Sequence, residues 1–200
     1  MSSAIAQPAD QRFHRRDNEL LGRARCGDAV AFEQLAGPHV DRLFATALRL
    51  VGDSGQAEDV VQETLLRAWR GIRRFRRRSQ FSTWLYRIAV NESSRANERN
   101  ARRPDMVLLE ADQLQAHSAP ETGPARQAEY RELLVALDAA LLALPMPHRA
   151  AVVLRDLQGL STREAANIIG ISEGAFKSRL HQGRMEMRSR LGDAALIAAA

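Results

Sequence analysis

The side chains best suited to chemistry in this sequence are basic ones that could bind nucleic acid, and they fall in two clusters. The first cluster follows the Gly170-Ile171-Ser172 turn and combines basic and hydroxyl side chains at helical spacing. Its members are Lys177, Ser178, Arg179, His181 and Arg184. Arginine and lysine can pair with guanine edges or phosphates, whereas serine and histidine contact either more weakly. The first cluster therefore predicts contact with duplex DNA.

A helix-turn-helix would position this first cluster. Ser161-Thr162-Arg163-Glu164 is a capping-box sequence that begins a short helix. Gly170 supplies the positive φ of the turn, and Ala165 and Ala166 are small enough to let two helices cross closely. Ser172 then caps the second helix. The simpler alternative is a helical hairpin with a solvated basic face, but the cap, the turn and the small residues all agree on a DNA-binding helix-turn-helix.

The second cluster is an arginine-rich run followed by aromatic side chains. The run covers residues 73–80 and leads into Phe81, Trp84 and Tyr86. Single-stranded DNA binds to positive grooves with aromatic platforms, because arginine holds the backbone while unpaired bases stack on the rings. Asn91, two helical turns beyond Trp84, could hydrogen-bond a base that has left the duplex. The second cluster thus predicts a site for unpaired DNA.

Structural alternatives exist for each part of the second cluster. Trp84 and Ile88 fit one helical face and could belong to the core. The arginines at residues 76–78 could form a solvated loop, and Asn91 could be an ordinary surface residue of its helix.

An acidic helix face precedes the arginine-rich run. Residues 57–72 carry an apolar stripe at helical spacing, and the polar side chains lie away from it. These polar residues are Glu58, Asp59, Gln62 and Glu63. Acidic residues in a first turn also favour the helix dipole, which is the structural alternative. The functional interpretation is a docking face for a basic protein partner.

The distribution of charge supports a polyanionic partner more strongly than the total does. The net charge is +5, but residues 67–103 hold 12 arginines against two acidic residues. No stretch approaches the ~20 apolar residues of a membrane span, and no signal peptide is evident at the N-terminus. The single cysteine, Cys26, excludes an intramolecular disulfide and a cysteine-based zinc site. We therefore expect a cytoplasmic protein without membrane insertion.

Periodicity and helix breakers predict an all-α fold of two small domains. We expect a disordered tail over residues 1–16, a first domain over 17–103 and a second over 125–191. The breakers Gly27, Gly37-Pro38 and Gly52 divide the first domain into helices. Residues 104–124 contain three prolines and lack periodicity, which indicates a flexible linker. A tail over residues 192–200 has no predicted role.

Three motifs in this order resemble extracytoplasmic-function (ECF) sigma factors of the sigma-70 superfamily. Residues 56–69 resemble their polymerase-binding segment, and residues 81–91 resemble their minus-ten-reading helix. Residues 160–184 resemble their minus-thirty-five-reading helix-turn-helix, and Leu144-Pro145 followed by His148-Arg149 matches the entry to that domain.

The resemblance implies a four-helix sigma-two-like domain and a sigma-four-like domain, which recruit RNA polymerase to promoters in a stress or envelope response. It implies that Asp59, Gln62 and Glu63 face the beta-prime clamp helices of core polymerase, while the beta flap is a second contact. The first cluster would bind the minus-thirty-five duplex. The minus-ten set implied by the resemblance is Phe75, Arg76, Arg77, Ser79, Trp84, Arg87, Ile88 and Asn91. The family further implies an anti-sigma partner, and no catalytic residue, metal or cofactor is expected.

The chain departs from the family pattern at three places. Relatives often carry Gly and Asp in the loop that captures a flipped base, where residues 76–78 are all arginine. Phe176 replaces a small branched residue, and Gly183 stands where alanine is common. The arginine loop bears most directly on function, because it would touch the captured base.

Two other classes of function compete with the sigma factor. A stand-alone helix-turn-helix regulator would read DNA with residues 125–191 and use residues 17–103 as a sensor or dimerisation domain. That class leaves the arginine-aromatic cluster and the acidic face without a role. A nucleic-acid enzyme lacks support, because the sequence offers no metal-ligand cluster, phosphate-binding glycine loop or nucleophile-base pair, and its histidines are scattered.

Overall fold

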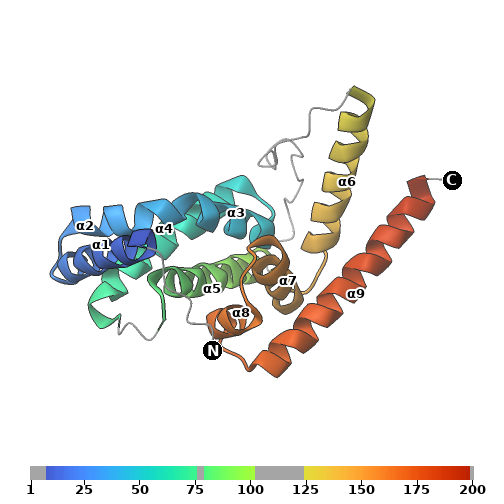
Figure 1. Ribbon diagram of the computed structural model, residues 1–200. Coiled ribbons are helices and arrows are strands. Elements are labelled where there is room, and N and C mark those ends of the chain that lie inside the picture. Colours follow the sequence, from blue (N-terminus) through green and yellow to red (C-terminus); the bar gives the residue numbers. More distant parts are fainter. Residues whose placement is uncertain (1–7, 76–78, 102–123, 199–200) are drawn as a thin grey trace.

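The computed structural model describes residues 8–75, 79–101 and 124–198, and every regular element among them is a helix or a helical turn. The predicted all-α fold of two helical domains is confirmed (Figure 1). The predicted linker at residues 104–124 lies almost wholly outside the described residues, as do residues 1–7 of the predicted tail.

The first domain is built from five α-helices within its described residues, because Gly37-Pro38 divides the second predicted helix with a 3-10 turn. Its elements are α1 (Pro8–Arg25), α2 (Ala29–Ala36), the turn Gly37–His39, α3 (Val40–Val51), α4 (Ser54–Gly71), the 3-10 turn Ile72–Arg74 and α5 (Phe81–Ala101). The second domain contains α6 (Pro124–Leu142), α7 (Met146–Val152), a π-helical turn (Val153–Leu157), α8 (Thr162–Ile169) and α9 (Glu173–Ala198).

Short polar caps fix where the helices of the first domain begin. The Asp28 carboxylate accepts a hydrogen bond of 3.0 Å from the backbone N–H of Ala31, which lowers the pKa of Asp28. Asp53 caps α4 in the same way through the N–H of Gln56, at 2.8 Å. Each cap satisfies a backbone donor that the first helical turn leaves unpaired.

Two helix ends differ from the sequence-based expectation. The first helix begins at Pro8, well before the expected start near Asp17. Proline fits the first helical position because its missing N–H would be unpaired there anyway. The last helix continues to Ala198, beyond the expected end at Leu191. Its final residues are rich in alanine, the strongest helix former, and contain no proline.

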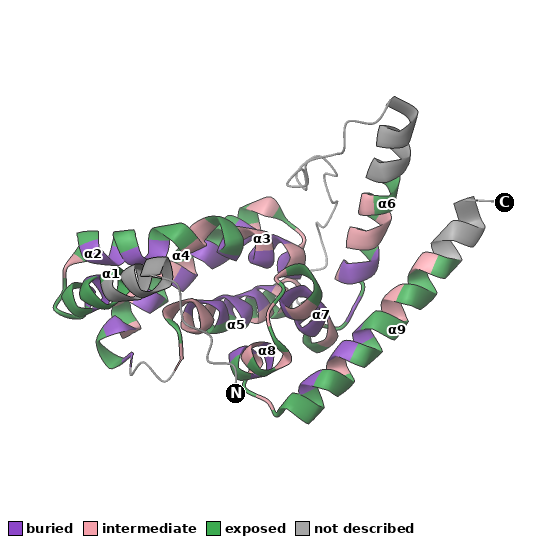
Figure 2. Ribbon diagram, in the orientation of Figure 1, coloured by how far each residue is buried: buried purple, intermediate pink, exposed green. Residues whose placement is uncertain are grey.

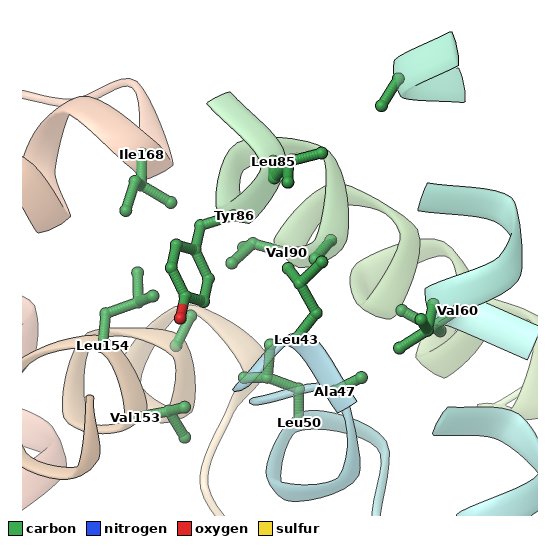
Figure 3. Packing of buried hydrophobic residues seen from close by; sticks show 14 of the residues in the cluster. Leu43, Ala47, Leu50, Val60, Leu85, Tyr86, Val90, Val153, Leu154 and Ile168 are labelled. Atoms are coloured by element: carbon green, nitrogen blue, oxygen red, sulfur yellow. The ribbon is translucent and has the colours of Figure 1, made fainter. Parts of the chain in front are cut away.

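The two domains share one hydrophobic core. The buried faces of α3 and α5 turn toward the π-helical turn and α8, as the burial colours of Figure 2 and the close-up of Figure 3 show. The ring of Tyr86 on α5 lies beside Leu154 and Ile168 of the second domain (Figure 3). Fully burying an aliphatic side chain such as that of Leu154 or Ile168 stabilises a fold by roughly 1.5–3 kcal/mol. The apolar contact across the domain boundary is therefore a substantial part of the fold.

A buried arginine adds polar contacts across the same boundary. The guanidinium of Arg149 donates to the carbonyl of Leu50 in α3, to that of Leu142 at the end of α6 and to that of Leu144 just after it, the last at 3.0 Å. Burial lowers the pKa of Arg149. On α5, Asn97 donates to the same Leu50 carbonyl at 3.0 Å and lies 3.7 Å from the sulfur of Met146. The carbonyl at the end of α3 is thus held from both domains.

Candidate nucleic-acid and polymerase interfaces

The helix-turn-helix has the local geometry that its sequence predicts. The backbone N–H of Glu164 donates to the Ser161 hydroxyl at 3.2 Å, and the N–H of Ser161 donates to the Glu164 carboxylate at 3.0 Å. The Ser161 hydroxyl also donates to the Glu164 carboxylate at 2.6 Å, and this hydrogen bond, together with that from the Ser161 N–H, lowers the pKa of Glu164. Gly170 has φ of 78° at the turn, and Ser172 accepts from the N–H of Ala175 at 3.2 Å. The capping box, the turn glycine and the second cap are all confirmed.

The first cluster lies along the N-terminal half of α9. Lys177, Ser178 and His181 are exposed, and Arg179 is half-buried. Arg184 is exposed but forms a two-pronged ion pair with Asp156 of the π-helical turn, at 2.5 and 2.9 Å, and this hydrogen bonding raises the pKa of Arg184. The pair uses Nε and Nη2 of Arg184, so only Nη1 stays fully available to DNA while the pair is intact.

Gly183 explains how α9 approaches α7 so closely. A Cβ atom at this position would lie 2.9 Å from Cγ2 of Val152 and 3.2 Å from the carbonyl oxygen of His148. His148 also pairs with Glu186 of α9 at 2.8 Å. The lack of a side chain at Gly183 therefore permits a tight helix crossing.

We predict that Gly183→Ala lowers the free energy of unfolding by about 1–3 kcal/mol, because the added methyl group overpacks the α7–α9 contact. Gly174→Ala is the matched control in the same helix, since nothing lies within 4 Å of its Cβ position. Because Gly174 is exposed in the first turn of α9, that control should change the free energy of unfolding by no more than about 0.5 kcal/mol. Urea unfolding measures the free energy of unfolding of both variants. A free energy of unfolding that does not fall in Gly183→Ala would contradict the tight crossing of α7 and α9.

The aromatic side chains of the second cluster pack on one another. Phe75 is buried, and its ring centroid lies 5.0 Å from that of Trp84 and 6.1 Å from that of Phe81. Trp84 is half-buried and approaches Gly71, whose Cβ position lies 3.2 Å from its ring. Phe75 is therefore an internal support for Trp84 and Phe81, which reach partway to the surface.

The remaining minus-ten residues divide among exposed, half-buried and undescribed positions. Arg87 and Asn91 are exposed one helical turn apart on α5, whereas Ser79 and Ile88 are half-buried. Arg87 also donates a hydrogen bond of 2.5 Å to the backbone carbonyl of Asn167 in α8. Arg76 and Arg77 of the capture loop lie outside the described residues.

Uncompensated positive charge lies directly before the capture loop. In the same domain Arg67 pairs with Glu63 and Glu92, at 2.6 and 3.2 Å. Arg70, Arg73 and Arg74 are exposed at the end of α4 and in the turn after it, and no described carboxylate pairs with any of them. A positive surface of this kind attracts a nucleic-acid backbone.

Part of the acidic face of α4 is exposed to solvent. Asp59 and Gln62 are exposed, whereas Glu63 is half-buried and engaged by Arg67. Leu66 lies one turn beyond Gln62 and is 49% exposed. Leu66 belongs neither to the predicted apolar stripe nor to the predicted docking residues, and its exposure adds an apolar contact to the acidic face.

Two features are absent from residues 8–75, 79–101 and 124–198. No group of three or more histidine, cysteine, aspartate or glutamate side chains in these ranges could hold a metal ion. None of the helices in the same ranges is long and apolar enough to cross a membrane.

Two protein-family models match the parts of the chain that carry these surfaces. A family model described as Sigma-70 region 2 matches residues 35–103, and one described as Sigma-70, region 4 matches residues 134–187. The chain belongs to the sigma-70 family. It is a sigma factor, the specificity subunit of RNA polymerase, as the three motifs predicted.

The relatives of this sigma factor place it in the ECF group. It is 34% identical over 181 residues to the ECF sigma factor SigM of Mycobacterium tuberculosis, covering 90% of this chain and 87% of the relative. It is 32% identical to SigW of Bacillus subtilis, covering 86% and 95%. A solved structure of the sigma factor RpoE with the anti-sigma factor NepR from Bartonella quintana superposes with a TM-score of 0.61, at 27% identity over 80% of this chain and 96% of that one.

Proposed function

We propose that this sigma factor binds core polymerase through Asp59, Gln62 and Leu66, and reads promoters with its two basic clusters. The observation that carries the proposal is the exposure of three separate surfaces on one chain. These are the acidic face of α4, the α5 face with Arg87 and Asn91, and the N-terminal half of α9. A sigma factor uses the first for docking, the second for unpaired minus-ten DNA and the third for minus-thirty-five duplex. It performs no catalysis itself and acts where the chromosome is, in the cytoplasm.

Promoter binding requires the two domains to separate. The minus-ten and minus-thirty-five elements lie about 25 base pairs apart, which is roughly 85 Å of duplex at 3.4 Å per base pair. The domains instead share a core, and Arg87 is held by the carbonyl of Asn167. Between Ala101 and Pro124 the chain has 22 residues, and an extended chain of that length spans at most on the order of 75 Å. The segment, which overlaps the linker proposed for residues 104–124, is long enough for most of this separation.

An anti-sigma factor is the proposed regulator. The RpoE structure from Bartonella quintana contains such a partner. A protein that binds both domains of this chain in the packed arrangement would keep the minus-ten and minus-thirty-five surfaces from spanning a promoter.

A stand-alone helix-turn-helix regulator is the competing function, and a mobility-shift assay separates the two. We expect a promoter fragment to shift only when the purified chain and core polymerase are both present. A strong, sequence-specific shift by the chain alone, unchanged by core polymerase, would favour the regulator.

We predict that Asp59→Ala combined with Gln62→Ala weakens binding to core polymerase by about 10-fold, because it removes a charge and an amide from the docking face. Glu33→Ala with Gln34→Ala is a control of equal charge change on the exposed face of α2. Fluorescence titration of labelled protein with core polymerase gives both affinities. Equal affinity for the two double variants would leave the α4 face without a docking role.

A further inference from the structure

Arg95 continues the face of α5 that carries three of the predicted minus-ten residues. Trp84, Ile88, Asn91 and Arg95 follow one another at intervals of four, three and four residues along this helix. At 3.6 residues per turn, these positions lie within about 60° of one another around the helix axis. Arg95 lies about 6 Å beyond Asn91 along the axis, on the side away from the capture loop. A ligand that reaches Asn91 therefore comes close to Arg95.

A buried carboxylate holds the side chain of Arg95 in place. The side chain of Glu92 is only 7% exposed, and its Oε1 accepts a hydrogen bond of 2.7 Å from Nη1 of Arg95. The same oxygen lies 3.2 Å from Nε of Arg67 on α4. Burying a charged group is costly unless it is paired, so Glu92 keeps both arginines near it. The guanidinium of Arg95 is thereby fixed against the surface of its own helix.

Most of this guanidinium remains available for a ligand. The side chain of Arg95 is 55% exposed, and no described residue accepts a hydrogen bond from its Nε or Nη2. These two nitrogens share one edge of the planar group, and an arginine edge can bind a phosphate through two parallel hydrogen bonds. Because the pair with Glu92 uses Nη1, a phosphate can bind this edge while the pair is intact.

We propose that Arg95 binds a backbone phosphate beside the nucleotide that contacts Asn91, and that Glu92 positions it for this role. The proposal rests on the proposed function, which brings the minus-ten strand to this face of α5. An acidic protein segment would also suit an exposed arginine, but the aromatic ring of Trp84 on the same face favours a nucleic acid. A phosphate contact fixes the position of the strand and carries no base information. Arg95 therefore adds affinity and register without changing base preference.

The test uses holoenzyme assembled from core polymerase and the full chain, with labelled single-stranded minus-ten oligonucleotides. Arg95→Gln should weaken strand binding by about 5-fold. It should also reduce the slope of log affinity against log salt by about 0.7, the contribution of one phosphate on a single strand. Arg95→Lys, which keeps the charge, should keep the slope. Both variants should bind core polymerase as tightly as the unaltered chain.

Arg163→Gln is the matched control, since it makes the same charge change at an exposed arginine of α8 in the other domain. A minus-ten strand does not extend to the minus-thirty-five surface. We therefore expect this control to retain both the affinity and the salt slope of the unaltered chain.

An uncharged methylphosphonate, placed at each linkage of the strand in turn, locates the contact. At one linkage it should weaken binding by the unaltered chain about 5-fold and have almost no further effect on Arg95→Gln. Losses that add at every linkage, or a salt slope unchanged by Arg95→Gln, would overturn the proposal and leave Arg95 as a structural partner of Glu92. Failure of the unaltered holoenzyme to bind any of these strands would overturn the proposed function as well.

Discussion

A covalent bridge between the two domains is expected to reduce promoter-dependent transcription at least 10-fold, because minus-ten and minus-thirty-five DNA lie roughly 85 Å apart. Asn97→Cys and Met146→Cys place the bridge across the boundary, where the Asn97 amide nitrogen lies 3.7 Å from the Met146 sulfur. Both positions are half-buried and lie outside the proposed DNA and polymerase contacts. Cys26→Ser removes the one native thiol, which is exposed.

The bridge should be a short bis-maleimide with a reducible disulfide in its spacer. The same sample can then be assayed before and after cleavage, so any effect of the substitutions themselves cancels. Each single-cysteine variant, treated with the same reagent, controls for the modification of one side chain. Full activity of the bridged protein would show that both promoter elements are read without domain separation.

Arg149→Ala is expected to lower the free energy of unfolding by about 3 kcal/mol, because it removes the guanidinium donor from the carbonyls of Leu142 and Leu144 and leaves that of Leu50 with Asn97 alone. Arg149→Lys should recover only part of this loss, since an ammonium group cannot reproduce the planar fork of donors. The exposed Arg163 of α8 is the matched control, and Arg163→Ala should change stability by no more than about 0.5 kcal/mol.

Urea unfolding followed by circular dichroism measures all three variants. Similar free energies for Arg149→Ala and Arg163→Ala would contradict the role of the buried guanidinium as a link between α3 and the segment after α6.

Local sequence signals predicted the local structure well, because a cap or a turn is decided within a few residues. The Ser161–Glu164 capping box and the left-handed Gly170 are both where the sequence places them. The start of α1 at Pro8 was missed because the residues before Asp17 show no apolar period to mark a helix. The π-helical turn Val153–Leu157 has no local signal, since its residues also fit an ordinary helix.

Contacts between distant residues set the limit on predicting the site. Arg149 matched a family motif, but nothing near it in the sequence indicates that it binds the carbonyl of Leu50. The pairing of Arg184 with Asp156 spans 28 residues and engages a side chain that was predicted to be free for DNA. Asp17 of α1 and His39 of the turn after α2 likewise line one pocket only because α1 packs beside α2.

Run-off transcription with purified core polymerase tests the account most directly. Templates are drawn from the source genome, and transcript ends are mapped with and without the chain. We predict discrete start sites that appear only when core polymerase and the chain are combined, each preceded by shared minus-ten and minus-thirty-five sequences. Transcription that is unchanged when the chain is added, together with tight duplex binding by the chain alone, would contradict its role in promoter selection.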